Sequence, residues 1–347
     1  MTAAQDRALA AVRARAPDDD AVVPGAPALT INLHPDRLDR RGRPVLEALV
    51  ADGEVHNQFV TGISAGGLDS VMGGARTRWE QAMFGDAYDH AGPHERPRYA
   101  GLSLVRDPWG ACPRFGSGHL RLRPELLERT TFTWGDSVTD PTAAGVWGRM
   151  GAVLRAAQAD GWSELTGAPR RAADLLDTYV EAQVHAPVRL ARDVAALVLD
   201  ESFRGGAVER VAEAAAASCG FDLEWAPARS LDPDALDPAF RTELTPRLAR
   251  EVHARLARPG QPLDAELVGR AAQEVVRSRG EGWQAYGDLV QVLQEVKYLW
   301  HHLVRFGTPG TLRPGGHSQV VACCAKASPV CTGTTQNSRP PGSVRTT

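Results

Sequence analysis

The pattern of apolar residues changes near residue 205, and this change limits the possible folds more than any other feature. Before that point, short segments with alternating or β-branched residues are separated by Gly, Pro and Asp. They predict β-strands at residues 28–33, 58–64, 99–105, 119–123, 129–134, 179–190 and 194–199. Beyond it, apolar residues recur at helical spacing, which predicts helices at residues 207–218, 240–256, 264–277 and 283–303 and leaves one strand at 221–225. We therefore expect an α+β fold with a helical C-terminal region.

The same patterns divide the chain into four parts. Residues 1–27 read as an N-terminal helix (3–16) and a linker that is broken by Asp, Pro and Gly. Residues 28–205 form the main body, with further helices expected at 44–51, 76–84 and 142–160, and residues 206–306 form the helical region. Residues 307–347 are rich in Gly, Pro, Ser, Thr and Cys without any periodicity, so we expect a disordered tail.

Charge and cysteine usage exclude several classes of protein. The net charge is −3, and the lysines of the chain are Lys297 and Lys326. Proteins that bind nucleic acid concentrate positive charge on their surface, so we expect no nucleic-acid partner. No apolar run approaches the roughly 20 residues of a membrane span, and no signal peptide is visible. We therefore expect a cytoplasmic protein that does not cross a membrane. Export of such a protein would need a route that does not use a signal peptide. Cys112 and Cys219 stand alone in the body, so we expect no disulfide framework and no metal site.

The segment TYVEAQVH is the most informative for chemistry. Because alternate residues of a strand share a face, Tyr179, Glu181, Gln183 and His185 should lie together, opposite an apolar face. An edge strand with a solvated polar face would have the same pattern. Gly-rich strand ends elsewhere in the body favour a ligand site instead, since glycine lets the backbone approach a ligand closely.

Other segments supply further candidates. QFVTGISAGGLDS contains small residues whose amides suit phosphate groups, and Thr61, Ser64, Gly66 and Gly67 are the expected contacts, although the segment lacks the order of a P-loop or a dinucleotide fold. His34 ends the strand at 28–33 and precedes Pro35, Asp36 and Arg37, where Asp36 could help to start a helix. The turn after residue 134 offers Asp136 as a ligand contact or as an Asx turn.

Taken in order, the motifs LHPDR, QFVTGISAGG, RWEQAMFGDAY, ERPRYAGLSL, PRFGSGHLRLRPELLERTTFTWGDS and YVEAQVHAPVRL resemble a family of bacterial and fungal domains of unknown function. That family in turn resembles mono-ADP-ribosyltransferases, nearest to the diphtheria-toxin type with its His, Tyr and Glu trio. The resemblance covers residues 28–306 and implies a split β-sandwich that binds NAD. It also implies transfer of ADP-ribose to a side chain of an unidentified protein, as in bacterial effectors and toxins.

The resemblance assigns roles to three catalytic residues: His34 to the adenosine-side ribose, Tyr99 to stacking on nicotinamide, and Glu181 to the catalytic carboxylate. The cofactor-binding contacts we expect around them are Arg37, Thr61, Ser64, Gly66, Gly67, Gln183 and His185, with NAD as substrate and no metal. Many transferases carry Glu or Gln two residues before the catalytic Glu, where this chain has Tyr179. An alternative register places Gln183 at the catalytic position.

Two other functions remain open at this point. The first is a catalytically inactive nucleotide-binding or protein-interaction module, with the helical region as its partner surface. The second is a metal-dependent hydrolase that uses His34 and His185.

Overall fold

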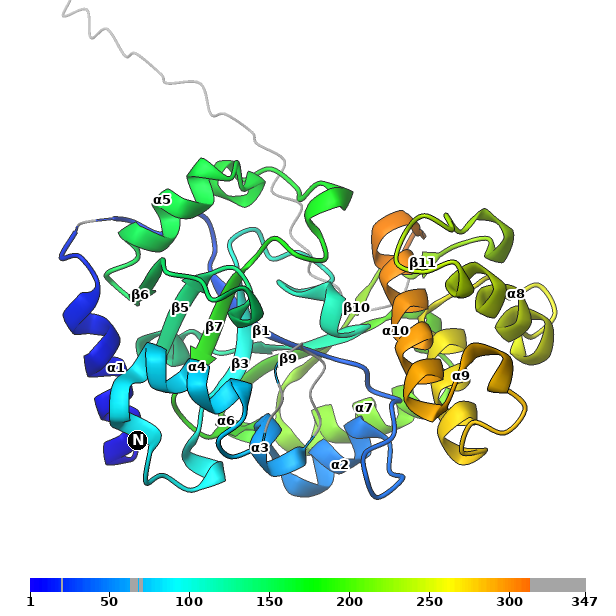
Figure 1. Cartoon of the computed structure of the whole chain (residues 1–347), viewed down its shortest axis with the longest axis horizontal. Coiled ribbons are helices and arrows are strands. Elements are labelled where there is room, and N and C mark those ends of the chain that lie inside the picture. Colours follow the sequence, from blue (N-terminus) through cyan, green and yellow to red (C-terminus); the bar gives the residue numbers. More distant parts are fainter. Residues whose placement is uncertain (20, 63–67, 69–70, 313–347) are drawn as a thin grey trace, which may run out of the picture. The chain divides into compact units, whose positions relative to one another are not determined.

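An eight-stranded sheet with the strand order β10-β9-β4-β1-β3-β7-β5-β6 organises the fold (Figure 1). The structure is a computed structural model that describes residues 1–19, 21–62, 68 and 71–312. Neighbouring strands pair antiparallel, except for the parallel pair β9 and β10. The strands of this sheet are β1 (Ala28–Leu33), β3 (Arg98–Ser103), β4 (Gly118–Leu122), β5 (Thr130–Trp134), β6 (Ala144–Val146), β7 (Val180–Val184), β9 (Val194–Asp200) and β10 (Asp222–Ala226).

Two smaller two-stranded sheets join segments that are distant in sequence. In the first, β2 (Glu54–Val55) pairs with β8 (Val188–Arg189). In the second, β11 (Arg229–Ser230) pairs with β12 (Thr308–Pro309). The start of the segment that we predicted as a disordered tail thus takes part in the fold, while residues 313–347 lie outside the described residues.

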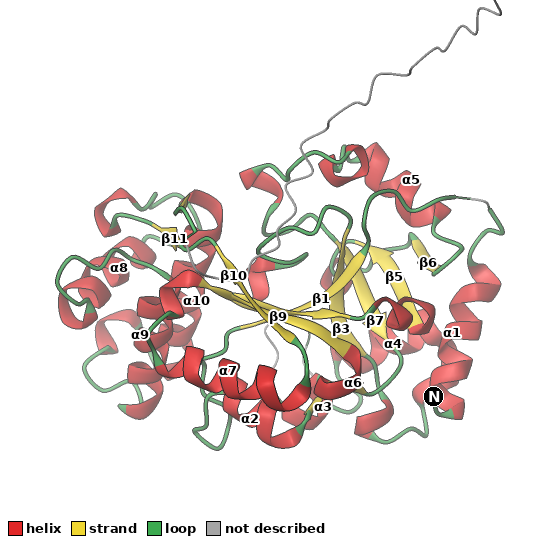
Figure 2. Ribbon diagram, turned by 180° about the vertical axis from the view of Figure 1, so that it is seen from behind, coloured by secondary structure: helices red, strands yellow, loops and turns green. Residues whose placement is uncertain are grey.

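Helices surround the large sheet (Figure 2). Those in the described part of the chain are α1 (Ala3–Arg15), α2 (Val45–Asp52), α3 (Gln58–Thr61), α4 (Ala75–Phe84), α5 (Gly151–Ala159), α6 (Leu190–Asp193), α7 (Ala207–Cys219), α8 (Leu244–Leu256), α9 (Ala265–Arg277) and α10 (Leu289–Phe306). Figure 2 shows α1 and α4 at the β6 end of the sheet and α8, α9 and α10 at the β10 end. None of these helices combines the length and the apolar character that crossing a membrane requires.

The expected α+β fold with a C-terminal helical region is confirmed. Helix α9 begins where Asp264 accepts a hydrogen bond from the backbone of Leu267, and α10 begins at a capping box formed by Asp288 and Gln291. Helices α8, α9 and α10 pack against one another through buried apolar side chains such as Leu248. The 3.6-residue period therefore predicted the correct structure in this region.

Three sequence-based boundaries were wrong. Residues 58–61 of the expected strand 58–64 form α3, because the Asn57 side chain accepts hydrogen bonds from the backbone of Phe59 and Val60 and so starts a helix. Residues 62–64 do not continue a described strand, since only Gly62 of them is described. The expected helix 142–160 is instead strand β6 followed by α5, and the expected strand 179–190 is divided into β7 and β8.

Strand β7 lies inside the sheet and is buried on both faces. Val180, Ala182 and Val184 pack into the main apolar core, and none of these side chains is accessible to solvent. On the opposite face, Glu181 is 5% exposed and Gln183 is fully buried. The polar face is therefore covered by protein, which rules out the alternative of an edge strand with a solvated face.

Candidate active site

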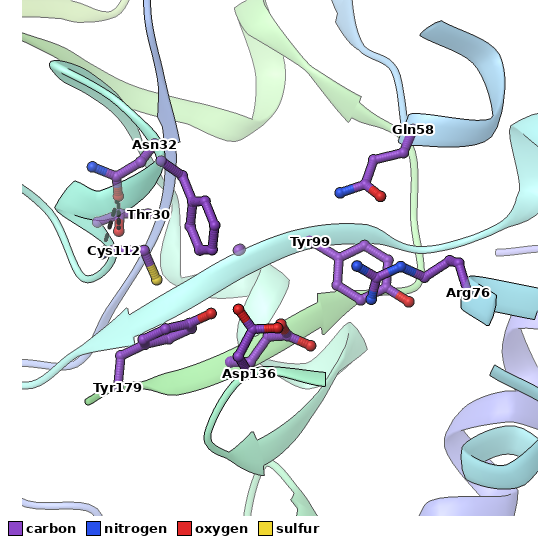
Figure 3. A pocket seen from close by; sticks show the side chains of 11 residues that line it. Thr30, Asn32, Gln58, Arg76, Tyr99, Cys112, Asp136 and Tyr179 are labelled. Atoms are coloured by element: carbon purple, nitrogen blue, oxygen red, sulfur yellow. Dashed lines mark hydrogen bonds between the residues drawn. The ribbon is translucent and has the colours of Figure 1, made fainter. Parts of the chain in front are cut away.

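A cavity of about 110 Å³ lies over the polar face of β1, β3 and β7 (Figure 3). Its walls combine two carboxylates, a guanidinium, two amides, a thiol and aromatic rings. The residues that line it are Thr30, Asn32, Gln58, Arg76, Tyr99, Ala100, Cys112, Phe115, Asp136, Tyr179 and Glu181. An enclosed site with convergent polar groups is the usual setting for ligand binding or catalysis.

A glycine allows one wall of the cavity to approach the sheet. Thr30, Gly101 and Glu181 lie in register on β1, β3 and β7. A Cβ atom on Gly101 would lie 2.4 Å from Sγ of Cys112 and 2.7 Å from Cβ of Ala111. The backbone N–H of Ala111 donates to the hydroxyl of Thr30 at 2.8 Å. The loop that carries Cys112 therefore packs directly on β3 because position 101 has no side chain.

The carboxylate of Glu181 is held by three hydrogen bonds. Its Oε2 accepts from the backbone N–H and from the hydroxyl of Ser137, both at 3.2 Å, and its Oε1 accepts from the Gln183 side-chain amide at 3.1 Å. Arg76 donates from Nη1 to the same Ser137 hydroxyl at 2.5 Å. A positive charge thus lies one side chain away from the Glu181 carboxylate.

Burial and the neighbouring carboxylate of Asp136 raise the pKa of Glu181 to about 7, while Arg76 and the hydrogen bonds from Ser137 and Gln183 act in the opposite direction. A carboxyl group with such a pKa changes its charge near neutral pH. Strongly shifted carboxyl groups in cavities are typical of functional sites.

Asp136 and Tyr179 form a polar corner of the cavity. Oδ1 of Asp136 accepts from the backbone of Val138 at 2.9 Å and starts the short 3₁₀ helix Ser137–Thr139. The Asp136 carboxylate and the Tyr179 hydroxyl face one another (Figure 3), and burial with the nearby carboxylates of Glu181 and Asp136 raises the pKa of Tyr179. This corner therefore presents a carboxylate and a hydroxyl to a polar group that enters the cavity.

Arg76 lies over the ring of Tyr99. Its guanidinium carbon is 4.1 Å from the ring centre, which is a close cation–π contact. The Tyr99 hydroxyl donates to Oε1 of Glu80 at 3.0 Å, and Glu80 forms a buried ion pair with Arg96. Tyr99 is therefore fixed at the edge of the cavity, and one face of the ring that we expected to stack on nicotinamide contacts a guanidinium.

Gln183 and His185, both expected to bind the cofactor, do not line the cavity. The Thr131 hydroxyl bridges them, at 2.7 Å from Oε1 of Gln183 and 2.9 Å from Nε2 of His185. The hydroxyl of Tyr88 lies 2.6 Å from Nδ1 of His185. Burial lowers the pKa of His185 to about 3, so its ring is neutral. These residues support Glu181 from within the protein and lie outside the lining of the cavity.

His34 and Arg37 lie outside the lining of the cavity. By alternation, His34 follows Thr30 and Asn32 on the same side of β1, but it comes after the end of the strand. Its Nδ1 is 3.3 Å from the Ser117 hydroxyl, and its ring meets the Trp300 ring edge-on at 5.2 Å between centres. The structure does not bring His34 to Glu181.

The expected phosphate-binding segment is described in part. Thr61 is the last residue of α3, and its hydroxyl donates to the backbone carbonyl of Asn57 at 3.2 Å. Ser64, Gly66 and Gly67 lie outside the described residues. Gln58, from the first turn of α3, is the residue of this segment that lines the cavity.

His34 and His185, the histidines of the hydrolase alternative, have different neighbours in the part of the chain that the structure describes. Among those residues, no group of three or more His, Cys, Asp or Glu side chains is arranged to hold a metal ion. Instead, His34 contacts Trp300, and His185 is bound to Thr131 and Tyr88. The hydrolase alternative thus has no arrangement of ligands in support of it here.

Comparison with known proteins identifies the family. A family model described as "Protein of unknown function (DUF3626)" matches residues 28–166 and 158–306. The chain belongs to this family. Every residue that lines the cavity lies within the matched segments, whereas α1 precedes them. The cavity is therefore built from the part of the chain that defines the DUF3626 family.

A curated relative matches over a shorter segment. The "Gene 2 protein" of Mycobacterium phage D29 is 34% identical over 93 residues, which is 27% of this chain and 32% of the phage protein. The chain thus spans about a third of the length of that relative.

Several lining residues of this DUF3626 protein were missed from the sequence alone. Asn32 was detectable, since it alternates with His34 on the strand that was predicted correctly. Arg76, Gln58 and Cys112 carry no local signal, because each comes from a different helix or loop that reaches the cavity only through tertiary packing.

Proposed function

We propose that this protein transfers ADP-ribose from NAD to a side chain of another protein and releases nicotinamide, with Glu181 as the catalytic carboxylate. The observation that carries the proposal is the placement of Glu181 in an enclosed cavity beside Arg76 and the rings of Tyr99 and Phe115. The motif series that suggested this activity lies within the segments matched by the DUF3626 family.

The proposed reaction breaks the bond between ribose C1′ and the nicotinamide nitrogen. Nicotinamide leaves with the bonding electrons as a neutral molecule, and positive charge develops at C1′ and the ring oxygen of the ribose. Ionised Glu181 accepts a hydrogen bond from the ribose 2′-hydroxyl and stabilises this charge. A nucleophile of the acceptor protein then bonds to C1′ and loses a proton. A preorganised carboxylate of this kind contributes about 2.7–4 kcal/mol to lowering the barrier.

Asp136 is the residue we propose to receive that proton. Its carboxylate lines the cavity and faces the Tyr179 hydroxyl, where a group that enters can reach it (Figure 3). Its electrostatic effect on the pKa of Glu181 indicates that the two carboxylates are neighbours. In this proposal Asp136 takes the proton from the acceptor side chain, and Glu181 binds the 2′-hydroxyl of the ribose.

The aromatic contacts suit a flat ring. Phe115 and Tyr179 meet edge-on at 6.1 Å between ring centres. Tyr179 lies on the opposite side of the cavity from Arg76 (Figure 3). We place the nicotinamide between these rings and the free face of Tyr99, since Arg76 covers the other face. Two carboxylates nearby favour the positively charged ring of NAD before the bond breaks.

The proposed fold is the split β-sandwich of ADP-ribosyltransferases. The feature that supports it is the change of strand direction along the large sheet, which is continuous but whose β10-β9 end runs across the direction of its β7-β5 end (Figure 1). The site also lies on interior strands, where three neighbouring strands place side chains on one face.

Incubation with NAD tests the proposal. We expect purified protein to release nicotinamide in the presence of a cell lysate, and an acceptor protein to gain the mass of one ADP-ribose unit. Glu181→Gln keeps an acceptor for Ser137 and should lower the rate about 100-fold or more. It is preferable to Glu181→Ala, which would leave the buried donors of Ser137 and Gln183 without a partner.

The matched control is Asp200→Asn. Asp200 is fully buried, accepts hydrogen bonds from backbone N–H groups, and has a pKa that burial raises to about 7, yet it lies outside the cavity. It should retain wild-type activity once folding is verified. Equal losses in both variants, or no nicotinamide release by folded wild type, would contradict the enzymatic proposal.

A nucleotide-binding module without catalysis is the second candidate. The observation that favours it is that both oxygens of Glu181 already have donors from the protein. Calorimetry with NAD separates the two candidates. Saturable binding together with no nicotinamide release identifies a binding module, whereas binding with release identifies the transferase.

A further inference from the structure

Helix α10 presents basic side chains toward the loop that forms one wall of the cavity. Lys297 and His301 are four residues apart and share a face of the helix. Trp300 fixes this face against the loop, because its Nε1 donates to the backbone carbonyl of Pro113 at 2.7 Å. The next residue of the loop is Arg114, which therefore lies beside α10.

Arg241, from the segment before α8, completes the group. Both Arg114 and Arg241 contact the carboxylate of Asp177, at 2.5 Å and 3.9 Å. The guanidinium of Arg241 lies 5.9 Å from the ring centre of Tyr298, and that ring lies 5.8 Å from the ring of His301. Two guanidinium groups thus share one carboxylate, which is itself 59% exposed, beside a lysine and a histidine.

His301 is buried in this group without satisfying its polar atoms. It is 1% exposed, and neither ring nitrogen has a hydrogen-bond partner among the described residues. Burial together with the charges of Arg241, Arg114 and Lys297 lowers the pKa of His301 to about 2. Burial and both arginines also lower the pKa of Lys297. The charges of Arg114, Arg241 and Lys297 thus act together on His301, and both arginines share the carboxylate of Asp177.

Arg241 adopts a backbone conformation that residues other than glycine rarely adopt. Its φ is 71°, in the left-handed region. The guanidinium also lies 4.9 Å from the ring centre of its neighbour Phe240. Strained residues persist where the surrounding structure requires them, and they concentrate at functional sites.

We infer that Arg114, Arg241, Lys297 and His301 form an anion-binding site for a phosphate or diphosphate group. Guanidinium groups bind phosphate oxygens through paired N–H donors, and an ammonium group adds a further donor. A bound anion would offer these donors acceptors in addition to the carboxylate of Asp177, and the imidazole N–H of His301 would gain an acceptor. This inference does not depend on the proposed transferase activity.

The anion site adjoins the cavity but is distinct from it. Phe115 lines the cavity and follows Arg114 in the chain, and Asp136 acts on the charge of Lys297 from the cavity side. A phosphate in the anion site can therefore belong to the same dinucleotide that fills the cavity or to a separate phosphorylated molecule. Both sources share the same chemistry at these four side chains.

Equilibrium binding of inorganic pyrophosphate to the full chain tests the site. We expect saturable binding that weakens with added salt, and an increase in Kd of about tenfold or more in each of Arg114→Gln, Arg241→Gln and Lys297→Gln. Arg210→Gln, which removes an exposed arginine of α7, is the matched control and should bind like wild type. Circular dichroism verifies that each variant is folded. If a variant does not fold, the binding of pyrophosphate to the wild-type protein still tests the site.

A competition arm identifies the source of the phosphate. If pyrophosphate displaces NAD, the anion site holds the diphosphate of the dinucleotide, and if both bind together, it serves a separate phosphorylated ligand; either result supports the site. Glu181→Gln should bind pyrophosphate normally, so a failed transferase assay leaves this inference intact. Absence of saturable pyrophosphate binding by wild type at low salt, or equal binding by all folded variants, overturns it.

Discussion

Gln183 donates its side-chain amide to Oε1 of Glu181 at 3.1 Å while its own Oε1 accepts from the Thr131 hydroxyl at 2.7 Å. The second bond fixes the orientation of the amide, so its donor end must face the carboxylate. Thr131 also contacts His185, which extends the network into the core. The position of Glu181 is thus determined by residues that never reach the cavity.

Gln183→Leu should destabilise the protein by about 2 to 4 kcal/mol, because it leaves Thr131 and Glu181 with unsatisfied buried groups. Urea unfolding measures this difference. Gln158→Leu, at an exposed position of α5, is the control and should change the free energy of unfolding by less than about 0.5 kcal/mol. Similar effects in both variants would show that the network contributes little.

Glu181→Gln should make the free energy of unfolding less dependent on pH. The pKa of Glu181 is raised in the folded state to about 7, so its contribution to stability is fully present below its unfolded value, about 4.3, and is lost as the pH rises through about 7. We expect the variant to gain about 1 to 3 kcal/mol relative to wild type between pH 5 and pH 8. Parallel stability curves for the two proteins would contradict the raised pKa.

Nicotinamide release, if the proposed activity holds, should increase with pH. The ionised form of Glu181 stabilises the positive ribose, and burial with the Asp136 charge raises the pKa of its carboxyl group to about 7 in the free protein. The kcat/KM for NAD should therefore rise to a plateau with a midpoint at about 7. A profile that is flat from about pH 5.5 to 8.5 would assign this role to another group.

Gly101→Ala should disturb the cavity wall. The added methyl group would lie 2.4 Å from Sγ of Cys112, so the loop must move away from β3, at a cost of about 1 to 3 kcal/mol. Thermal unfolding measures the loss. Gly92→Ala is the control, since the nearest heavy atom to its new Cβ would be 4.0 Å away. Equal melting temperatures for the two variants would show that the loop adapts freely.

Arg96→Met should destabilise the protein by about 3 to 5 kcal/mol, because it leaves the carboxylate of Glu80 buried without its ion-pair partner. Replacing both partners, in Glu80→Gln with Arg96→Met, should recover part of the loss. Arg155→Met removes an arginine that is 62% exposed and pairs with Asp19 at 3.2 Å, and it should cost about 1 kcal/mol or less. Chemical denaturation of the three variants gives the comparison.

Local patterns in the sequence predicted most strands and helices but not what covers them. In a strand, successive side chains lie on opposite faces, so the local sequence of residues 28–33 and 179–184 is enough to predict which side chains share a face. The strand β1 has the predicted bounds. The β-branched residues Val60 and Thr61 suggested a strand, whereas the Asn57 cap gave a helix. A cap competes directly with β-propensity, and the propensity was the weaker effect here.

The candidate site was predictable only where it lies on the sheet. Glu181 and Tyr99 line the cavity as expected, because both belong to strands whose faces follow from alternation. Arg76 reaches the cavity from α4, and no pattern near residue 76 indicates which strand that helix will cover. His34 lies outside the lining of the cavity, since it shares a side of β1 with Asn32 but comes after the end of the strand.

Because β7 lies between β3 and β5, the site should open only when the whole sheet opens. The backbone of β7 pairs with both neighbours from Val180 to Val184, so its amide hydrogens should exchange with solvent only when the entire unit opens. Fraying at the chain ends cannot loosen the carboxylate independently. A heated sample should therefore keep an intact site until the last protected amides are lost.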